Sequence, residues 1–313
     1  MYKTLLKYFL RRNSPAKAFK IATDILAAIR KLPFGRALIR LFYKRRIPST
    51  AKTELFGLTF PNPVGLAAYI DTDGVFYNSL SDFGFSFVEI GPLTYIDQGY
   101  SISPKHYRGV KKAIERLRTD KPDCIISGNI TRNAQSKGPE VLKDYENAFA
   151  LLYDFVDMIV IHPHRSPAEA ESAEDISDIP DIIDRILTMR LYYDKNKPVL
   201  LRLTPHLSHA QTDELIDCCL SCGVDGVVAG GTLRATDDLT GSGLFNRNLE
   251  LVRYISEKSR GLLPIVAVGG IMNAEEARAM LRAGASLVEV YTGLFREGPS
   301  IVKNIVNKLC IRA

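Results

Sequence analysis

The chain has 313 residues, of which 46% are hydrophobic and 24% charged, which is enough to bury one large core. No low-complexity tract or internal repeat is visible in the sequence, which excludes disordered and solenoid proteins. The net charge of +6 is unevenly spread, because residues 1–46 hold thirteen Lys and Arg against Asp24 alone and carry +12, whereas the remainder carries −6. A basic arm on an acidic body predicts contact with an anionic partner, either phospholipid or nucleic acid.

The basic arm has the pattern of two short amphipathic helices. Ser14 before Pro15 is a typical helix start, and apolar residues at helical spacing then predict a helix over about 15–31. A second helix fits Phe34 to Tyr43. No run of 18 apolar residues occurs, so we expect residues 1–46 to lie on a membrane surface rather than cross it. The alternative is a charged face packed on the body, and no nucleic acid is expected because no binding motif accompanies the basic residues.

From Thr53 onward, short β-branched runs alternate with helical stretches, the pattern of βα units around a parallel sheet. A hairpin around Gly57 precedes eight predicted strands. These are Val64–Ala68, Phe85–Gly91, Cys124–Ile130, Met158–His162, Val199–Leu203, Gly226–Ala229, Ile265–Val268 and Leu287–Tyr291. The sequence therefore predicts an α/β fold, a (β/α)₈ TIM barrel over residues 47–313 behind the helical extension, with its chemistry just after the strands.

The five cysteines are odd in number, unevenly spaced and not preceded by a secretory leader, which predicts a reducing, cytoplasmic location. Cys219 and Cys222 match a CxxC spacing. They fall in the last turn of a predicted helix running into Gly223, and no second pair follows for zinc, so a packing role is favoured over redox or metal chemistry.

Small residues follow the last three predicted strands, where Ser242-Gly243, Gly269-Gly270 and Tyr291-Thr292 leave backbone amides uncovered. In barrels, the loops after strands 7 and 8 often bind a phosphate together with a helix N-terminus. We therefore predict a phosphorylated ligand, and the alternative is that the glycines serve only as turns.

An ordered set of motifs resembles the class 2, quinone-linked dihydroorotate dehydrogenases over nearly the whole chain. The motifs are Phe60–Ala68, Asp71 with Gly74, Phe87–Gly91, Gly223–Gly226, Ala267–Ile271, Arg282–Ala285, Tyr291–Gly293 and Glu297–Pro299. The resemblance implies an FMN barrel that oxidises dihydroorotate to orotate in pyrimidine synthesis. It also implies electron transfer to a quinone through the N-terminal helices, with the protein held peripherally on the inner membrane from the cytoplasmic side.

The resemblance also implies roles for individual residues. Ala67 and Ala68 would lie along the flavin, and Arg202 stands at the position of a flavin-side lysine on the fifth strand. The FMN phosphate would be held by Ser242, Gly243, Gly269, Gly270, Tyr291 and Thr292, all of which match the family pattern.

Around the expected substrate the chain departs from the family pattern. Tyr69 replaces a glycine beside the flavin, Thr72 replaces a lysine, and Pro92 replaces a small hydroxyl residue. The asparagine-rich loop that binds orotate has no counterpart between Arg108 and Cys124. We therefore expect the substrate loop to be lost.

The catalytic segment His162-Pro-His-Arg-Ser-Pro167 places Arg165 at the family's serine base, with Ser166 one residue away. His162 and His164 are candidates for a substitute base, or for a metal pair with His206 as a third ligand. No metal is predicted, because no carboxylate is identified to complete such a site.

Two functions follow from this pattern. The first is a dihydroorotate dehydrogenase-like flavoprotein that keeps its FMN and phosphate site but oxidises dihydroorotate weakly or not at all, or a flavin oxidoreductase acting on another substrate. The second is a membrane-associated, non-catalytic paralogue that binds FMN or phosphate. The overall resemblance favours the first function, and the substitutions favour the second. Both stay open at this point, because resemblance in fold alone does not decide function.

Overall fold

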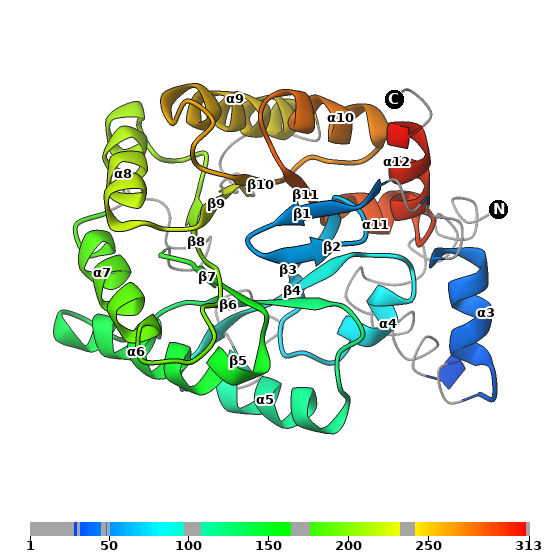
Figure 1. Cartoon of the computed structure of the whole chain (residues 1–313), viewed down its shortest axis with the longest axis horizontal. Helices are drawn as coiled ribbons and strands as arrows, with labels where there is room; N and C mark the ends of the chain where they lie inside the picture. The colour runs from blue at the N-terminus through cyan, green and yellow to red at the C-terminus, as the bar shows by residue number, and fades with distance from the viewer. Residues whose placement is uncertain are drawn as a thin grey trace.

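The structure, a computed structural model, describes residues 28–29, 32–44, 48, 51–96, 108–163, 176–231 and 242–310. Viewed in Figure 1, strands form a central ring and helices surround it. The predicted helix over 15–31 lies outside the described residues, apart from Ala28 and Ile29, which are helical. No helix within the described ranges is long and apolar enough to cross a membrane.

Eight parallel strands close the barrel. They are β3 (Val64–Asp71), β4 (Phe87–Thr94), β6 (Ile125–Ile130), β7 (Met158–Ile161), β8 (Val199–Leu203), β9 (Gly226–Gly230), β10 (Ile265–Val268) and β11 (Leu287–Val290). Each pairs with the next, and β3 pairs with both β4 and β11, so the ring has no open edge. The short β5 (Arg108–Gly109) adds to the end of β4. The predicted TIM barrel is thereby confirmed.

A helix follows each barrel strand and packs on the outside. These helices are α4 (Tyr77–Ser81), α5 (Val110–Thr119), α6 (Pro139–Leu152) with the 3₁₀ turn η3 (Tyr153–Phe155), α7 (Ile179–Arg190), α8 (His209–Cys222), α9 (Ser242–Lys258), α10 (Ala274–Arg282), α11 (Thr292–Glu297) and α12 (Ile301–Cys310). Local capping fixes several of their ends. Asn273 accepts a hydrogen bond from the Glu276 amide at the start of α10, and α8 ends at Gly223 in the left-handed conformation.

Alternate residues of each strand separate two cores, because successive side chains point to opposite faces. One core lies between the sheet and the helices. The other fills the barrel interior and includes Phe87, Met158, Val160, Leu200, Val266 and Leu287. The hairpin of β1 (Thr53–Leu55) and β2 (Leu58–Phe60) covers one end of this interior core, which Phe56, Leu58 and Phe60 join (Figure 1). The opposite end, where the strands finish, is left for the functional site.

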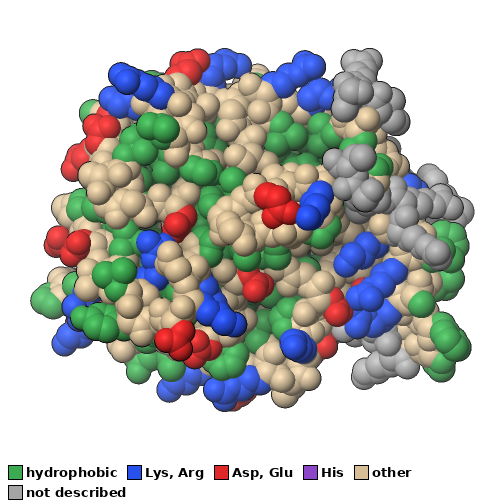
Figure 2. All heavy atoms as spheres, viewed as in Figure 1, with side chains coloured by type: hydrophobic (Ala, Val, Ile, Leu, Met, Phe, Trp, Pro, Cys, Tyr) green, Lys and Arg blue, Asp and Glu red, His purple; other side chains and the backbone are tan. Residues whose placement is uncertain are grey.

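The helix α3 (Gly35–Phe42) confirms the second predicted helix of the arm. Its Arg36 and Arg40 both pair with Asp82, which is fully buried, and with Asp123. The opposite side of α3 is apolar and exposed, with Phe34 86% and Leu38 56% accessible. Figure 2 shows hydrophobic side chains along its outer edge, at the right of the view. The basic face of α3 therefore packs on the barrel, and its apolar face is turned outward.

No cysteine within the described ranges forms a disulfide, and of the CxxC pair Cys219 is buried whereas Cys222 is exposed. Cys219 is fully buried in the outer core. The Cys222 sulfur lies 3.9 Å from that of Cys218, one helical turn away.

Candidate functional site

Three small-residue segments converge at one side of the barrel mouth. A Cβ atom added to Gly270, which follows β10, would lie 2.6 Å from the Cα of Phe245 in the first turn of α9. A Cβ added to Gly293 in α11 would lie 2.5 Å from the carbonyl oxygen of Ile271. Only glycine permits these approaches, so the ends of β10 and β11 and the start of α9 are in direct contact. We call this group of segments the phosphate end.

Asn248 of α9 joins the loops of the phosphate end. Its side-chain oxygen accepts a hydrogen bond from the Gly231 amide at 3.2 Å, and its side-chain nitrogen donates to the Gly231 carbonyl at 3.0 Å. The same side-chain nitrogen packs against Gly269, which adopts φ +102°. This fully buried asparagine was not predicted from the sequence, since a single asparagine in an amphipathic helix gives no distinctive signal.

The phosphate end has the properties of an anion site. Among the described residues, the amides of Gly269 and Gly270 donate to no carbonyl, and Thr292 begins α11 with its amide uncapped. The first turns of α9 and α11 contain no acidic residue that would repel an anion. Uncovered amides beside two helix N-termini fit a phosphate group, so this part of the chain fits the phosphate of FMN.

The other side of the mouth is lined by polar side chains from five strands, which we call the polar belt. They are Glu89 of β4, Asn129 of β6, His162 after β7, Arg202 of β8 and Glu289 of β11, each at most 5% exposed. Four of them follow, at a spacing of two, an apolar residue directed into the barrel, namely Phe87, Val160, Leu200 or Leu287. Asn129 pairs in register with Val160 and contacts Glu89, so all five face inward. The strands thus supply an ionisable layer directly above the apolar interior.

Hydrogen bonds connect the polar belt around Glu89. One oxygen of Glu89, Oε1, accepts from Asn129 Nδ2 at 2.7 Å and from Arg202 Nη1 at 3.2 Å. The Oδ1 atom of Asn129 lies 3.3 Å from Nδ1 of His162. The guanidinium of Arg202 is therefore balanced by a buried carboxylate, so it does not present an uncompensated positive charge to a bound flavin.

Glu289 is the electrostatically unfavourable member of the belt. Burial, and secondarily the neighbouring Glu89, raise the pKa of Glu289 well above its usual range, and the attraction of Arg202 opposes this only in part. Among the described residues, no donor pairs with either of its carboxyl oxygens. Burial therefore favours the protonated form of Glu289, which can donate to Glu89.

Tyr69, at the position where the family pattern has a glycine, adopts a positive φ angle. Its φ of +71° lies in the left-handed region, where a bulky side chain costs about 1–2 kcal/mol. Its ring lies edge-on to the ring of His162, with 6.0 Å between centroids. A large aromatic side chain thus stands over the polar belt, next to Ala67 and Ala68, which are both buried.

The proposed base segment lies outside the described residues, since His164, Arg165 and Ser166 belong to 164–175. His162 is described and lies in the belt. No group of three potential metal-ligating side chains occurs within the described ranges. The sequence analysis missed Glu89, Asn129 and Glu289, although charged or amide residues alternating with apolar ones inside buried strands were the available signal.

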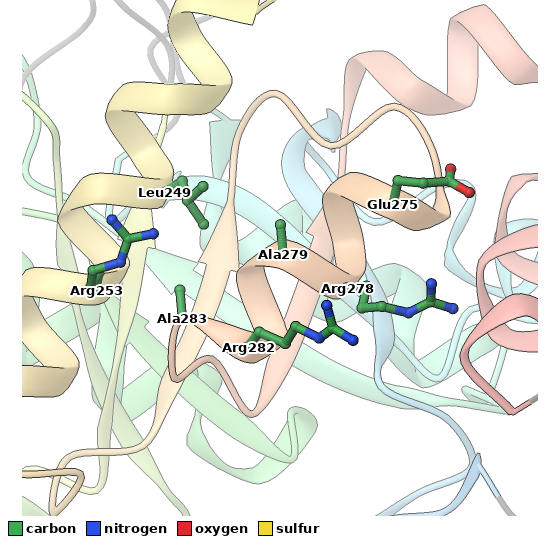
Figure 3. Close-up of a pocket in the computed structure, with 7 residues that line it drawn as sticks. All are labelled: Leu249, Arg253, Glu275, Arg278, Ala279, Arg282 and Ala283. Atoms are coloured by element: carbon green, nitrogen blue, oxygen red, sulfur yellow. The ribbon is translucent and has the colours of Figure 1, made fainter. Parts of the chain in front are cut away.

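A separate cavity of about 370 Å³ lies on the outer wall, between α9 and α10 (Figure 3). Arg253 comes from one helix and Arg278 and Arg282 from the other, with Glu275 near one end. It lies outside the barrel, behind the wall that supports the phosphate end, and shares no residue with the polar belt or the phosphate end.

Comparison with known proteins agrees with this arrangement. The family model for dihydroorotate dehydrogenase matches residues 106–312. The chain is 30% identical to the dihydroorotate dehydrogenase (quinone) of Christiangramia forsetii over 99% of this chain and 98% of that protein. It is 32% identical to the enzyme of the same name from Coxiella burnetii over 83% and 84% of the two chains. The chain belongs to the dihydroorotate dehydrogenase family.

Solved structures agree on the fold. Ligand-free DHODH from Eimeria tenella superposes with a TM-score of 0.79 at 21% identity, covering 95% of this chain and 94% of the other. The complex of that enzyme with ferulenol gives a TM-score of 0.80. The curated relatives place the chain in the quinone-linked class, a family of FMN-dependent flavoproteins of pyrimidine biosynthesis, so FMN is the cofactor that the site must accommodate.

Proposed function

We propose that this protein is a membrane-associated, FMN-binding member of the family in which dihydroorotate oxidation is weak or absent. The observation that carries the proposal is the pairing of Arg202 with Glu89 inside the polar belt. This pairing engages the cation at the family's flavin-side lysine position in a buried ion pair. Guanidinium geometry also differs from that of an ammonium group, so the substitution is not conservative.

At the phosphate end, Gly269, Gly270 and Thr292 would hold the FMN phosphate through backbone amides, with Ser242 and Gly243 of α9 and Tyr291 beside them. Ala67 and Ala68 would lie along the ring system, where small side chains leave room. When bound, FMN supplies the capacity to accept a hydride and pass electrons onward. Binding of the phosphate depends on backbone atoms, so it tolerates the substitutions seen elsewhere in the mouth.

The loss of activity follows from the catalytic segment. Arg165 at the base position does not accept a proton near neutral pH, because a guanidinium has no acceptor atom. Loss of a positioned general base typically lowers the rate by about 10²–10⁴-fold. The missing asparagine loop lowers it further, since substrate orientation is also lost.

Anaerobic stopped-flow mixing with dihydroorotate tests this proposal. The purified protein should show the absorption of oxidised FMN, and that band should bleach very slowly or not at all. Rapid bleaching at rates typical of the family would contradict the proposal. The variant Arg165→Ser restores the family's residue type and should speed any slow bleaching, whereas Arg118→Ser, on the exposed face of α5, serves as a matched control.

We further propose that residues 1–46 form a domain that binds the membrane surface, with quinone as the expected electron acceptor. The support is the orientation of α3, whose arginines bind Asp82 and Asp123 while Phe34, Leu38 and Phe42 are exposed. A helix with an apolar face beside basic residues binds favourably to the surface of an anionic bilayer. The barrel, residues 47–313, would then stand on the cytoplasmic side of the inner membrane.

Co-sedimentation with anionic vesicles tests the membrane proposal. The double variant Phe34→Glu/Leu38→Glu should abolish sedimentation, because it places charge on the apolar face without touching the ion pairs. The matched control is Leu191→Glu/Leu262→Glu, which changes two leucines that are 80% and 72% exposed elsewhere on the surface. Equal sedimentation of both double variants would refute a specific role for α3.

A second candidate, an FMN-binding oxidoreductase with another substrate, is favoured by one observation, the presence of Tyr69 over the polar belt. An aromatic ring at that point changes the shape of the substrate side while leaving the phosphate end intact. Bleaching of the flavin by a different reduced compound, with no bleaching by dihydroorotate, would favour this candidate. A flavin that no donor reduces would favour the non-catalytic paralogue.

A further inference from the structure

The side chain of His162 is held from one side by an amide. His162 follows β7, its own amide donates to Ile130 at 2.9 Å, and its carbonyl accepts from the Tyr145 hydroxyl at 2.7 Å. These backbone bonds fix where its side chain begins. The ring nitrogen Nδ1 then lies 3.3 Å from Asn129 Oδ1, within hydrogen-bond distance.

The orientation of the Asn129 amide follows from its other partner. The Asn129 amide turns its NH₂ group toward Glu89, since Nδ2 donates to Oε1 at 2.7 Å and Arg202 donates to the same acceptor oxygen. The carbonyl oxygen of Asn129 therefore faces His162. An amide oxygen cannot donate, so the proton of that contact belongs to Nδ1 of the histidine.

Two further neighbours surround the carboxyl group of Glu89. Nη1 of Arg202 donates to the same Oε1 atom at 3.2 Å, so this oxygen accepts hydrogen bonds from both Arg202 and Asn129. Burial, and then the neighbouring Glu89, raise the pKa of Glu289, which favours its protonated form.

We propose that Glu89 and Asn129 are positioning residues that lock His162 in the tautomer with its proton on Nδ1, which makes Nε2 the proton acceptor of this site. The hydrogen bonds from Arg202 and Asn129 to Glu89 orient the Asn129 amide. The Asn129 amide oxygen in turn determines which ring nitrogen of His162 carries the proton. A metal-free histidine oriented through its other ring nitrogen is a common arrangement for a general base.

This inference rests on the proposed function only where it assigns a task to Nε2. If dihydroorotate is oxidised slowly, Nε2 would accept the proton that the substrate loses, and FMN, when bound, would supply the acceptor for the hydride that leaves with it. Histidine can accept that proton near neutral pH, which Arg165 cannot. His162 is therefore the residue that would sustain any residual turnover.

Nitrogen NMR of the full-length protein as purified, labelled with ¹⁵N histidine, tests the tautomer directly. The sequence has only five histidines, and His162→Gln assigns the signal. At a pH above the histidine titration, His162 should show a protonated Nδ1 and an unprotonated Nε2. The opposite pattern in the wild-type protein would overturn the proposal.

Variants then separate positioning from folding. Asn129→Leu removes the acceptor, and Glu89→Gln allows the Asn129 amide to rotate, so both should shift the His162 tautomer toward a proton on Nε2. Glu89→Asp retains an acceptor-only group and should restore the wild-type pattern. Ser127→Ala is the matched control, since this buried hydroxyl lies two residues before Asn129 and has no hydrogen-bond partner. An unchanged tautomer in Asn129→Leu, with the barrel folded by circular dichroism, would also overturn the proposal.

Activity distinguishes the inference from the function on which it rests. If dihydroorotate reduces the flavin slowly, His162→Gln should lower that rate by about 10²-fold or more, the typical effect of losing a general base. If dihydroorotate never reduces the flavin but the tautomer is as stated, the positioning stands and the assigned task of Nε2 is wrong. Unchanged slow reduction in His162→Gln would likewise refute that task.

Discussion

The phosphate end and the polar belt lie at the same barrel mouth but present different chemical groups. The phosphate end presents backbone amides of Gly269, Gly270 and Thr292 and depends on close packing around Gly270 and Gly293. The polar belt presents five buried side chains, of which Glu289 has a raised pKa.

This difference explains how one end can keep the family pattern while the other departs from it. Backbone amides are present whatever the side chain, so an anion site survives as long as small residues permit the approach. Proton transfer needs a particular group with a suitable pKa at a particular place, and a single substitution removes it. Substitutions therefore alter proton transfer by side chains more readily than they alter phosphate binding by backbone amides.

The largest effect should come from Gly270→Ala. A new Cβ would meet the backbone of Phe245 at 2.6 Å, and alanine also disfavours φ +76°. Overpacking and the left-handed penalty together amount to about 3 kcal/mol, which corresponds to roughly 10²-fold weaker FMN binding. The measurement is FMN affinity by flavin fluorescence. Gly261→Ala is the control, since it shares a left-handed φ of +71° but has open space around it. Equal FMN affinities of Gly270→Ala and the wild-type protein would show that FMN binding does not depend on the close backbone approach at Gly270.

Glu289→Gln should stabilise the protein by on the order of 1–2 kcal/mol at pH 8, since the variant folds without taking up a proton, whereas burial favours the protonated carboxyl group of Glu289. The folded protein raises the pKa of Glu289, so the unfolded chain releases this proton at lower pH than the folded protein does. Wild-type stability therefore falls as pH rises above about 4.3, the ordinary glutamate pKa.

The gain from Glu289→Gln should consequently be small at pH 4 and grow toward pH 8, as measured by urea unfolding at each pH. The matched control is Glu275→Gln on the surface, whose carboxyl is paired with Lys308 and has a lowered pKa, so it should show no such gain. A gain independent of pH would mean that Glu289 is ionised in the folded protein.

The smallest effect concerns the strain at Tyr69. Tyr69→Ala removes the ring but keeps the left-handed penalty, whereas Tyr69→Gly removes both, so Gly should be more stable than Ala by about 1 kcal/mol. Thermal unfolding of the two variants measures this difference. A more stable alanine variant would indicate that the backbone relaxes once the ring is gone, and that Tyr69 itself imposes the conformation.

Most strands could be predicted because their signal is local. Val199–Leu203 and Ile265–Val268 have the predicted bounds, since continuous apolar runs mark strands covered on both faces. The strand β3 extends past the predicted Ala68 to Asp71, because the chain pairs again with β4 after an irregularity that includes Tyr69. The two-residue β5 was not predicted, since only its contact with Leu93 and Thr94 defines it.

The sequence by itself determined the number and order of the strands, the small residues after β10 and β11, and the expectation that Arg165 stands at the family's serine position. Each of these features lies in a short run of consecutive residues. Only the tertiary structure decided that Glu89, Asn129, His162, Arg202 and Glu289 form one belt, because they come from strands far apart in the chain and meet through barrel closure and register. The ion pair of Arg202 and the raised pKa of Glu289 both depend on neighbouring groups from other strands. Electrostatic interactions with such neighbours are strongest in a buried, low-dielectric interior.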